Sequence, residues 1–331
     1  MKAFAVVILN FNGRSLLERF LPAVIEHSRD AQIYVIDNCS KDDSLYWLKQ
    51  HYSEQIETIE LDQNYGFADG YNRGLQQVKE AFWCLLNSDV RVSKNYYQRP
   101  LELLRTFSKI AAVQPKILSE RAPDYFEYAG AGGGYIDGLG YPFCRGRLFQ
   151  SIEKDLGQYN DERQVFWATG ACMFIKKEVF DAIGGFDASY FAHQEEIDLC
   201  WRAHHKGYQV WYTSQSTVYH LGGSTLSNTN PFKTYLNFRN SLYSLFKNLT
   251  SRELLMILII RLLLDGVAGL LFLLQARPLH TLAILKAHFK FYSQLRTLVE
   301  KRRKHQPLKV NRKPFSIVLH YFVLGRKKIS I

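Results

Sequence analysis

The stretch Phe82-Trp83-Cys84-Leu85-Leu86-Asn87-Ser88-Asp89-Val90 decides the fold, because five apolar residues run directly into Asn-Ser-Asp. A continuous apolar run of this length is typical of a strand buried in a parallel sheet. Ligands bind at the carboxyl ends of such strands, so we expect Asp89 at a binding edge. A carboxylate there could hold a hard divalent cation, which prefers oxygen ligands and keeps positions for a diphosphate. The alternative is a strand-terminating turn, because Asn, Ser and Asp favour turns.

Alternating strand-like and helix-like blocks before this stretch predict a doubly wound α/β sheet. A capping box of Ser15 and Glu18 could begin the first helix. We expect strands at residues 3–9, 32–36 and 57–61, and helices at residues 15–26, 44–50 and 70–81.

The first two strands end in polar residues that could bind a ligand. The first is followed by Asn10-Phe11-Asn12-Gly13-Arg14 in place of GxGxxG, which argues against a dinucleotide-dependent dehydrogenase. The second ends in Asp37, whose carboxylate could accept hydrogen bonds from a uracil or thymine N–H or from a ribose hydroxyl. The same carboxylate could equally cap the next helix.

Small residues interrupt a later predicted strand. Residues 120–165 are rich in Gly, Tyr and Asp and indicate loops over the active edge of the sheet. A strand at residues 166–175 follows, and Gly170-Ala171 lies within it. These two residues leave room either for a group that approaches the backbone closely or for tight packing on a neighbouring strand.

A pair of glutamates, Glu195-Glu196, opens a predicted helix and, with Asp198, places three carboxylates within four residues. The helix macrodipole explains part of this charge, because it favours anions at an amino end. Like charges held close together also raise at least one pKa, which makes a carboxylate a useful general base. His220 closes a later strand, where it could be a metal ligand or a structural side chain.

The composition excludes a disordered chain, because 47% of the 331 residues are hydrophobic, and the length suits about two domains or one with an appendage. Five cysteines without CxxC spacing indicate reduced, buried thiols in a cytosolic compartment. The net charge of +11 is unevenly distributed. Residues 1–230 hold 23 Lys and Arg against 28 Asp and Glu, whereas residues 231–331 hold 19 against 3.

The basic region also contains an apolar stretch, residues 254–274, that is long enough to span a bilayer. Arg261 and Asp265 interrupt it, and each charge costs about 2.5–3.5 kcal/mol at a bilayer centre. Four residues apart, the two side chains lie on one helical face and could pair. We therefore expect a helix that lies in the membrane interface or against a neighbouring helix, not a clean span.

The surroundings of this stretch indicate an anionic membrane surface as the partner. Basic residues beside amphipathic helices favour anionic lipid, and a second apolar stretch at residues 315–324 ends in Arg326-Lys327-Lys328. Nucleic acid would explain the charge but not the apolar stretch, so we expect no nucleic-acid partner. The alternative is a helical bundle that packs on the rest of the chain with its lysines in water.

Taken in order, these segments resemble the family 2 glycosyltransferases of the GT-A fold, especially bacterial rhamnosyltransferase-like members that build cell-surface polysaccharide. The resemblance spans about residues 3 to 225. It rests on Val7-Ile8-Leu9-Asn10-Phe11-Asn12, Val35-Ile36-Asp37-Asn38-Cys39-Ser40, Asn64-Tyr65-Gly66-Phe67-Ala68, Asn72-Arg73-Gly74, Leu85-Leu86-Asn87-Ser88-Asp89, Thr169-Gly170-Ala171, Gly184-Gly185-Phe186-Asp187, Glu195-Glu196-Ile197-Asp198-Leu199-Cys200-Trp201-Arg202 and His220.

The resemblance implies roles for these residues. The strand end of that family usually reads Asp-x-Asp, and its last aspartate, here Asp89, would coordinate Mg²⁺ or Mn²⁺ on the donor's diphosphate. His220 resembles a second metal ligand, Asp37 corresponds to the residue that reads the pyrimidine, and Arg73 lies near the diphosphate. The donor-binding set would comprise Asn10, Asn12, Asp37, Asn64, Gly66, Phe67, Arg73, Asn87, Ser88 and Asp89.

The family's usual Glu-Asp pair is Glu195-Glu196 here. Its second member, Glu196, would be the base, with Glu195 as the alternative. The acceptor side would comprise Gly170, Ala171, Trp201 and Arg202. A metal ion that acts as a Lewis acid on the leaving group, with one base on the opposite face, implies direct displacement with inversion.

We therefore predict a GT-A catalytic domain at residues 1–230, with a Rossmann-like, mostly parallel sheet and flanking helices. Residues 231–331 are expected to form a basic, apolar helical region that associates with membrane. The predicted activity is transfer of a rhamnose-like sugar from dTDP, or another hexose from UDP, to a lipid-linked glycan at the cytoplasmic face of a bacterial inner membrane. The alternatives are a nucleotidyltransferase and a non-catalytic, membrane-bound glycan-binding protein.

Overall fold

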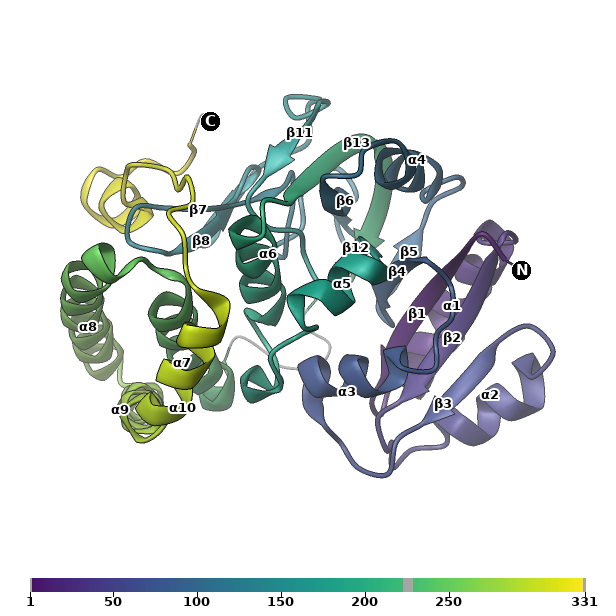
Figure 1. Cartoon of the computed structure of the whole chain (residues 1–331), viewed down its shortest axis with the longest axis horizontal. Coiled ribbons are helices and arrows are strands. Elements are labelled where there is room, and N and C mark those ends of the chain that lie inside the picture. The colour runs from purple at the N-terminus through teal and green to yellow at the C-terminus, as the bar shows by residue number, and fades with distance from the viewer. Residues whose placement is uncertain (1, 223–228, 330–331) are drawn as a thin grey trace.

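The computed structural model describes residues 2–222 and 229–329. Within them, nine strands form one central sheet in the order β11-β13-β6-β12-β4-β1-β2-β3, with β5 paired to β13 (Figure 1). These strands are β1 (Phe4–Asn10), β2 (Ala31–Asp37), β3 (Glu57–Glu60), β4 (Phe82–Asn87), β5 (Val90–Val92), β6 (Ile110–Ser119), β11 (Glu162–Val165), β12 (Cys172–Lys176) and β13 (Gln209–His220).

The sheet is parallel where the sequence predicts alternating strands and helices, and mixed elsewhere. Strands β3, β2, β1 and β4 run parallel, whereas β12 runs antiparallel to β4 and to β6. In this register Leu9 lies opposite Asn87, and Asn10 lies opposite Asp37. The polar ends of β1, β2 and β4 therefore meet at one edge of the sheet, as the sequence predicts.

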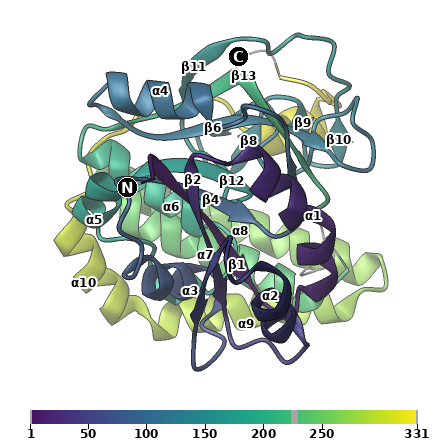
Figure 2. The ribbon, with the colours of Figure 1, turned by 90° about the vertical axis from the view of Figure 1, so that its right-hand side faces the viewer.

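Helices cover both faces of this sheet, which confirms the α/β prediction. One hydrophobic core lies against α1 (Arg14–His27), α2 (Ser44–Tyr52) and α4 (Gln98–Thr106). The other lies against α3 (Gly66–Leu75), α5 (Lys177–Ile183) and α6 (Glu195–His205). Figure 2 shows α4 and the C-terminal helices α9 (Pro278–Ser293) and α10 (Leu295–His305) at opposite sides of the molecule.

Helices α1 and α3 begin at residues other than the predicted ones. In each, the first backbone amides donate to groups from distant parts of the chain. The predicted capping box of Ser15 and Glu18 is wrong, because α1 already begins at Arg14, whose N–H donates to Asp42 Oδ2 at 3.0 Å. Helix α3 begins at Gly66 instead of residue 70 and ends at Leu75 instead of residue 81. The carbonyl oxygen of Phe191 accepts from the amides of residues 67 and 68 in its first turn.

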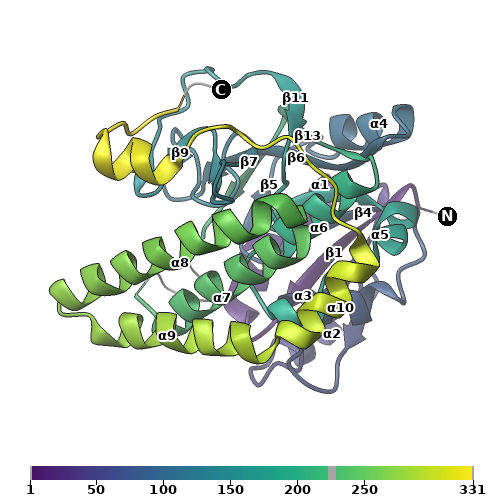
Figure 3. The same cartoon turned by 60° about the vertical axis from the view of Figure 1, so that its left-hand side comes forward.

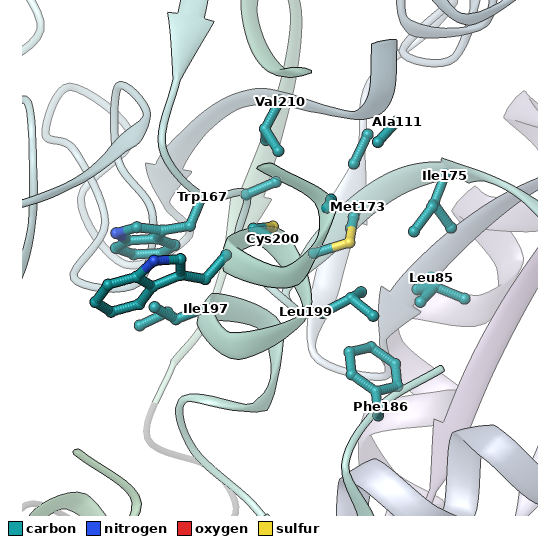
Figure 4. Close-up of a cluster of buried hydrophobic side chains, with 14 of the residues drawn as sticks. Leu85, Ala111, Trp167, Met173, Ile175, Phe186, Ile197, Leu199, Cys200 and Val210 are labelled. Carbon is teal, nitrogen blue, oxygen red and sulfur yellow. The ribbon is translucent and has the colours of Figure 1, made fainter. Parts of the chain in front are cut away.

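Helix α6 is fixed to the sheet by apolar side chains, as Figure 4 shows. Buried residues of the helix point at neighbouring strands, and the cluster includes Ile197, Leu199 and Cys200 of α6 with Leu85, Met173, Ile175 and Val210 of the sheet. The amino end of α6, which carries both glutamates, therefore has a rigid support.

The region predicted as loops over the sheet contains a second, smaller sheet. Its order is β10-β9-β8-β7, formed by β7 (Gly134–Ile136), β8 (Pro142–Cys144), β9 (Arg147–Leu148) and β10 (Ser151–Ile152). Strands of two or three residues are too short to show an alternating pattern, which is why the sequence does not reveal them. A short 3-10 helix, η1 (Ala188–Tyr190), precedes α6.

The first C-terminal helix, α7 (Pro231–Asn248), packs into the body of the molecule. Leu236, Leu242 and Leu245 are fully buried, and α7 contacts α6. Lys247, also fully buried, pairs with Asp187 at 2.6 Å and with Asp198 at 2.8 Å. The predicted domain limit after residue 230 thus falls between two segments of the structure that share a core.

Helices α8 (Ser251–Leu274) and α9 run side by side and project from the body (Figure 3). The predicted pairing of Arg261 with Asp265 is not what the structure forms. Arg261 donates to the Leu139 carbonyl at 3.1 Å, whereas Asp265 pairs with His288 of α9 at 3.0 Å. Both charges lie on the one buried stripe of α8, so each finds a partner in the protein. A π-helix, η2 (Leu319–Val323), follows α10 later in the chain.

We expect Lys247→Ala to lower the free energy of unfolding by about 3 kcal/mol, because removal of one partner leaves buried carboxylates uncompensated. Lys301 and Arg202 also contact these carboxylates and partly compensate them. The expected loss is therefore at the lower end of the roughly 3–5 kcal/mol that is typical of a broken buried ion pair. Urea denaturation measures the change. Lys286→Ala, an exposed position on α9, is the control and should have little effect. Equal stability of the two variants would show that α7 is not part of the cooperative unit.

Candidate active site

The ends of β1 and β2 form a buried polar corner. Asn10 Nδ2 donates to Asp37 Oδ2 at 3.0 Å and to Ser40 Oγ at 3.2 Å. Asp37 Oδ1 accepts from the Ser40 N–H at 2.8 Å, so this carboxylate caps its own turn and not helix α2, whose N-cap is Asp43. Asn10 Oδ1 is buried and has no hydrogen-bond partner among the described residues, which leaves an acceptor for a ligand donor.

A second group of donor-side residues surrounds the start of α3. Asn38 Nδ2 donates to Asn64 Oδ1 at 3.0 Å and to the Gly66 carbonyl at 2.9 Å. Gly66 has a φ of +73°, and a Cβ there would lie 2.5 Å from the Phe191 ring, so the position requires glycine. Asn38 is absent from the predicted set, although it directly follows Asp37 in the matching motif.

The remaining predicted donor residues are more exposed. Asn12, with a φ of 51°, accepts from the Lys41 N–H at 2.6 Å through Oδ1. Arg73 pairs with Asp69 at 2.9 Å and lies over the Tyr65 ring at 3.7 Å. A contact between Arg73 and a diphosphate would have to replace these interactions.

Asp89, His220 and Glu127 form a row of buried charged side chains beyond the end of β4. His220 Nε2 lies 3.1 Å from Asp89 Oδ1, and Nδ1 lies 3.1 Å from Glu127 Oε2. Burial alone would lower the pKa of His220, but the two carboxylates raise it to about 10. The sequence places Asp89 and His220 at strand ends, whereas Glu127 lies in the region predicted as loops.

The donor set of this row fits a divalent cation. A carboxylate and an imidazole nitrogen are adjacent, and a cation between them would replace the proton that Asp89 now holds on His220. The second ring nitrogen is oriented by Glu127, which is a common support for metal-ligating histidines. In the ranges 2–222 and 229–329, no group of three His, Cys, Asp or Glu side chains converges as a complete metal site. A cation held by Asp89 and His220 would therefore take its other ligands from outside, as Mg²⁺ does with substrate phosphates.

Gly170 and Ala171 lie between this row and the glutamate pair. The Asn87 N–H donates to the Ala171 carbonyl at 3.0 Å, which joins the end of β4 to this segment. A Cβ on Gly170 would lie 3.1 Å from the Phe67 ring, so the close approach is made by a side chain of α3. The Gly170 backbone amide also faces the Glu196 carboxyl group and counts among the groups that lower its pKa. Ser88 is partly buried between Asn87 and Asp89.

The glutamate pair follows a strained segment. Phe191, His193 and Gln194 have φ values of 64°, 69° and 69°, and such conformations cost about 1 kcal/mol or more per residue. Burial, followed by repulsion from Glu196, raises the pKa of Glu195. Burial raises the pKa of Glu196 to about 7 against several backbone amides that lower it. Glu196 is only partly buried, so it is the more accessible of the two.

Trp201 and Arg202 do not occupy the acceptor side that the sequence predicts. Both are buried, and the Trp201 ring packs edge-on against Phe166. Arg202 pairs with Asp198 at 2.8 Å and donates to the carbonyls of residues 183 and 185. They follow Glu196 by five and six residues, which at 3.6 residues per turn places them on the opposite side of the helix, facing the core. Their role is therefore to hold α6 in place.

Comparisons with known proteins identify the family of this chain. Residues 2–238 match the family described as Glycosyltransferase like family 2. The chain is 24% identical over 246 residues to the low-salt glycan biosynthesis hexosyltransferase Agl10 of Haloferax volcanii, covering 71% of this chain and 73% of that protein. It is 26% identical over 240 residues to the N-acetylglucosaminyl-diphospho-decaprenol L-rhamnosyltransferase of Mycobacterium tuberculosis, covering 66% of this chain and 76% of that protein.

Solved structures share the fold at low sequence identity. GalNAc-T7, determined with UDP, GalNAc and Mn²⁺, has a TM-score of 0.57 and 17% identity over 76% of this chain and 49% of its own. The mannosyltransferase PcManGT of Pyrobaculum calidifontis, with GDP-Man and Mn²⁺, has a TM-score of 0.52 and 13% identity over 92% of this chain and 84% of its own. The family match covers most of the chain, and the protein therefore belongs to glycosyltransferase family 2, as a nucleotide-sugar-dependent enzyme of GT-A-like fold.

Proposed function

We propose that this enzyme transfers a hexose, rhamnose-like or otherwise, from a nucleoside diphosphate to a lipid-linked saccharide, with inversion and with Mg²⁺ or Mn²⁺. The observation that carries the proposal is the short bridge between the two reactive groups. Asp89 lies two residues after Asn87, whose N–H donates to the Ala171 carbonyl. Gly170, directly before Ala171, presents its amide to Glu196. A leaving-group site and a base therefore lie on two sides of one small-residue segment.

The residues of this chain divide the reaction between them. Asp37 and the unpartnered Asn10 Oδ1 accept hydrogen bonds from the nucleoside. Asp89 and His220 would hold the cation, which when bound would neutralise charge on the departing diphosphate. Glu196 takes the proton from the acceptor hydroxyl as its oxygen bonds to the anomeric carbon. The bond from that carbon to the diphosphate breaks in the same displacement, so the configuration inverts.

Three of the similar proteins support the cation and the acceptor. Both solved structures named above carry Mn²⁺ beside a nucleotide or nucleotide sugar. The mycobacterial relative acts, by its name, on a saccharide carried by a decaprenol diphosphate. A carrier of this kind is confined to a membrane, so a membrane-binding surface would raise the local concentration of acceptor.

The α8–α9 hairpin is the membrane-binding surface that we propose. Within the described ranges, α8 is the one helix long and apolar enough to cross a membrane. Its buried residues, Ile257, Arg261, Asp265 and Gly269, form a single stripe, and the rest of the helix is largely exposed and apolar. Exposed apolar residues of the hairpin include Leu255, Met256, Ile259, Leu263, Val267, Leu270, Leu271, Leu273, Leu274, Leu279, Leu282, Leu285 and Phe289.

Charge supports an interfacial position for this hairpin. Lys286 and Lys290 are exposed next to the apolar residues of α9, and Arg296 is almost fully exposed in α10. Near an anionic surface each such charge contributes about 1 kcal/mol of attraction. The C-terminal segment that contains η2, drawn in yellow, lies on the same side of the molecule as α8 (Figure 1), and Arg326, Lys327 and Lys328, which follow it, are exposed.

Leu263→Glu combined with Leu270→Glu should abolish sedimentation of the full chain with anionic vesicles, because burial of each exposed leucine contributes about 1.5–3 kcal/mol. The control is Tyr46→Glu with Phe107→Glu, which alters two exposed apolar residues outside the hairpin and should leave binding intact. High salt should weaken wild-type binding without abolishing it. If the wild-type chain stays in the supernatant at low salt, the hairpin is not a membrane-binding surface.

A screen of sugar nucleotides tests the proposed reaction. We expect one of dTDP-rhamnose and the UDP-hexoses to raise the melting temperature only when Mn²⁺ or Mg²⁺ is present. The same donor should label a lipid-extractable saccharide, with an anomeric configuration opposite to that of the donor. Transfer of the nucleotide would identify a nucleotidyltransferase instead, and binding without turnover on any lipid-linked acceptor would identify a glycan-binding protein.

A further inference from the structure

Helix α7 holds the segment that precedes the glutamate pair. Arg239 Nη2 donates to the Ser189 carbonyl at 3.0 Å and to the Tyr190 carbonyl at 2.8 Å. Asn240 Nδ2 donates to the carbonyls of Tyr190 at 3.1 Å, Ala192 at 2.8 Å and His193 at 2.7 Å. Asn240 is fully buried and Arg239 nearly so. Two neighbouring side chains of α7 thus bind four carbonyls of residues 189–193.

The conformation of this segment requires external support. Phe191, His193 and Gln194 all have φ values in the left-handed region, which non-glycine residues adopt only where the surroundings impose it. The Gln194 side chain adds a hydrogen bond to α7, from Nε2 to the Asn237 carbonyl at 3.2 Å. Glu195 and Glu196 follow directly, so the direction in which α6 begins is set by this segment.

The same segment also contacts the donor side. The Phe191 carbonyl accepts from the amides of Phe67 at 2.6 Å and Ala68 at 3.2 Å, which begins helix α3. Residues 189–194 therefore lie between α3, which follows the donor loop, and α7. Loss of the α7 contacts would free the acceptor-side end of the segment while its donor-side contact to α3 stayed in place.

We propose that Asn240, assisted by Arg239, is a positioning residue for the transfer reaction, holding residues 189–194 so that Glu196 points at the acceptor hydroxyl. The inference rests on the proposed function, because it takes Glu196 as the base. It assigns α7, which the sequence groups with the membrane-associating region, to the catalytic apparatus. A base displaced by about 1 Å loses roughly a hundredfold in rate, so a small relaxation of the segment has a large effect.

Asn240→Ala tests the inference against a matched residue of the same helix, Asn248. Asn248 is equally buried, but its Nδ2 binds Asp198 at 2.8 Å and the Ser244 carbonyl at 3.0 Å and does not touch the segment. We expect Asn240→Ala to lower kcat about tenfold to a hundredfold with the donor KM within about twofold. Asn248→Ala should lower the melting temperature and leave kcat unchanged at temperatures where it is folded.

Two further measurements separate positioning from a general loss of structure. Amide hydrogen exchange of residues 189–194 should accelerate in Asn240→Ala and not in Asn248→Ala. The midpoint of the kcat/KM pH profile should fall in Asn240→Ala, because a freed Glu196 gains contact with water. If Asn240→Ala does not fold, Arg239→Lys keeps the charge but loses the forked donor group, and we expect it to show the same changes in smaller size.

Wild-type enzyme and Glu196→Gln are measured in parallel. If the wild type transfers sugar, Glu196→Gln does not, and Asn240→Ala matches Asn248→Ala in kcat, pH profile and exchange, the positioning role is overturned while the proposed function stands. If the wild type transfers no sugar, or Glu196→Gln retains full turnover, the proposed function fails and this inference fails with it.

Discussion

Glu196→Gln should lower kcat by about 10²–10⁴-fold and leave donor binding nearly unchanged, because a general base acts on the acceptor in the transition state. The substitution keeps the size of the side chain and removes only its ability to take a proton. Steady-state kinetics with varied donor and acceptor measure kcat and both KM values, and calorimetry with the nucleoside diphosphate measures donor affinity separately.

Glu195→Gln is the matched control for this result. Glu195 is the more deeply buried residue of the pair, so we expect its loss to raise the acceptor KM with a smaller change in kcat. The contradictory outcome is a near-normal kcat for Glu196→Gln together with a large loss for Glu195→Gln. In that case the two roles are exchanged.

The raised pKa of Glu196 gives this prediction a pH dependence. A base must be deprotonated to act, so kcat/KM of the wild type should rise with pH and level off above about pH 7. Stability should change in the opposite direction. The folded state holds this proton more tightly than the unfolded state, so stability falls as pH rises from the ordinary glutamate pKa to about 7. Urea denaturation at pH 5 and pH 8 should show that Glu196→Gln loses this part of the pH dependence.

Asp89→Ala should abolish cation-dependent donor binding. Removal of a residue that hydrogen-bonds to a metal ligand lowers the metal affinity about 10–100-fold, and removal of the ligand itself should lower it more. Calorimetry with the nucleoside diphosphate, with and without Mn²⁺, measures the difference. In the variant the two titrations should become indistinguishable, at an affinity close to that of the wild type without Mn²⁺.

Two controls make the Asp89 result specific. Asp181→Ala removes an exposed carboxylate of α5 whose salt bridge is to Lys177, and it should bind donor and cation as the wild type does. Circular dichroism should show that Asp89→Ala remains folded, because Glu127 still pairs with the buried His220. Unchanged Mn²⁺ dependence in Asp89→Ala would remove this residue from the cation site.

The strand ends could be predicted from the sequence because their signals are local. The apolar run before Asn87 and the short run before Asp37 each predict a buried strand, and parallel strands bring their polar ends to one edge. The mutual placement of Asp89 and His220 could not be derived in this way. It depends on the antiparallel pairing of β5 with β13, where His220 lies opposite Val90.

The residues that the sequence missed act through tertiary contacts. Glu127 lies in a region of very short strands and turns, where no periodic pattern marks a position as buried. Asn240 lies on a helix whose composition resembles the basic region after it, and its hydrogen bonds to three carbonyls of the segment before Glu195 are visible only in the fold. Trp201 and Arg202 were misplaced for the converse reason, because a motif gives the order of residues and not the direction in which each side chain points.

The two buried charges of α8 fix the rotation of the helix about its own axis. Arg261 is held by the Leu139 carbonyl and lies over the Tyr141 ring at 3.6 Å, and Asp265 is held by His288. Rotation of α8 about its own axis would separate both charges from their partners and expose them on the outward, apolar side of the helix. The helix can therefore present only one face outwards, and since α7 joins it to the catalytic segment, the height of Glu196 above that face is fixed. With that face on a membrane, as we propose, the enzyme would select its acceptor by the distance of the hydroxyl from the lipid surface, before any sugar is recognised.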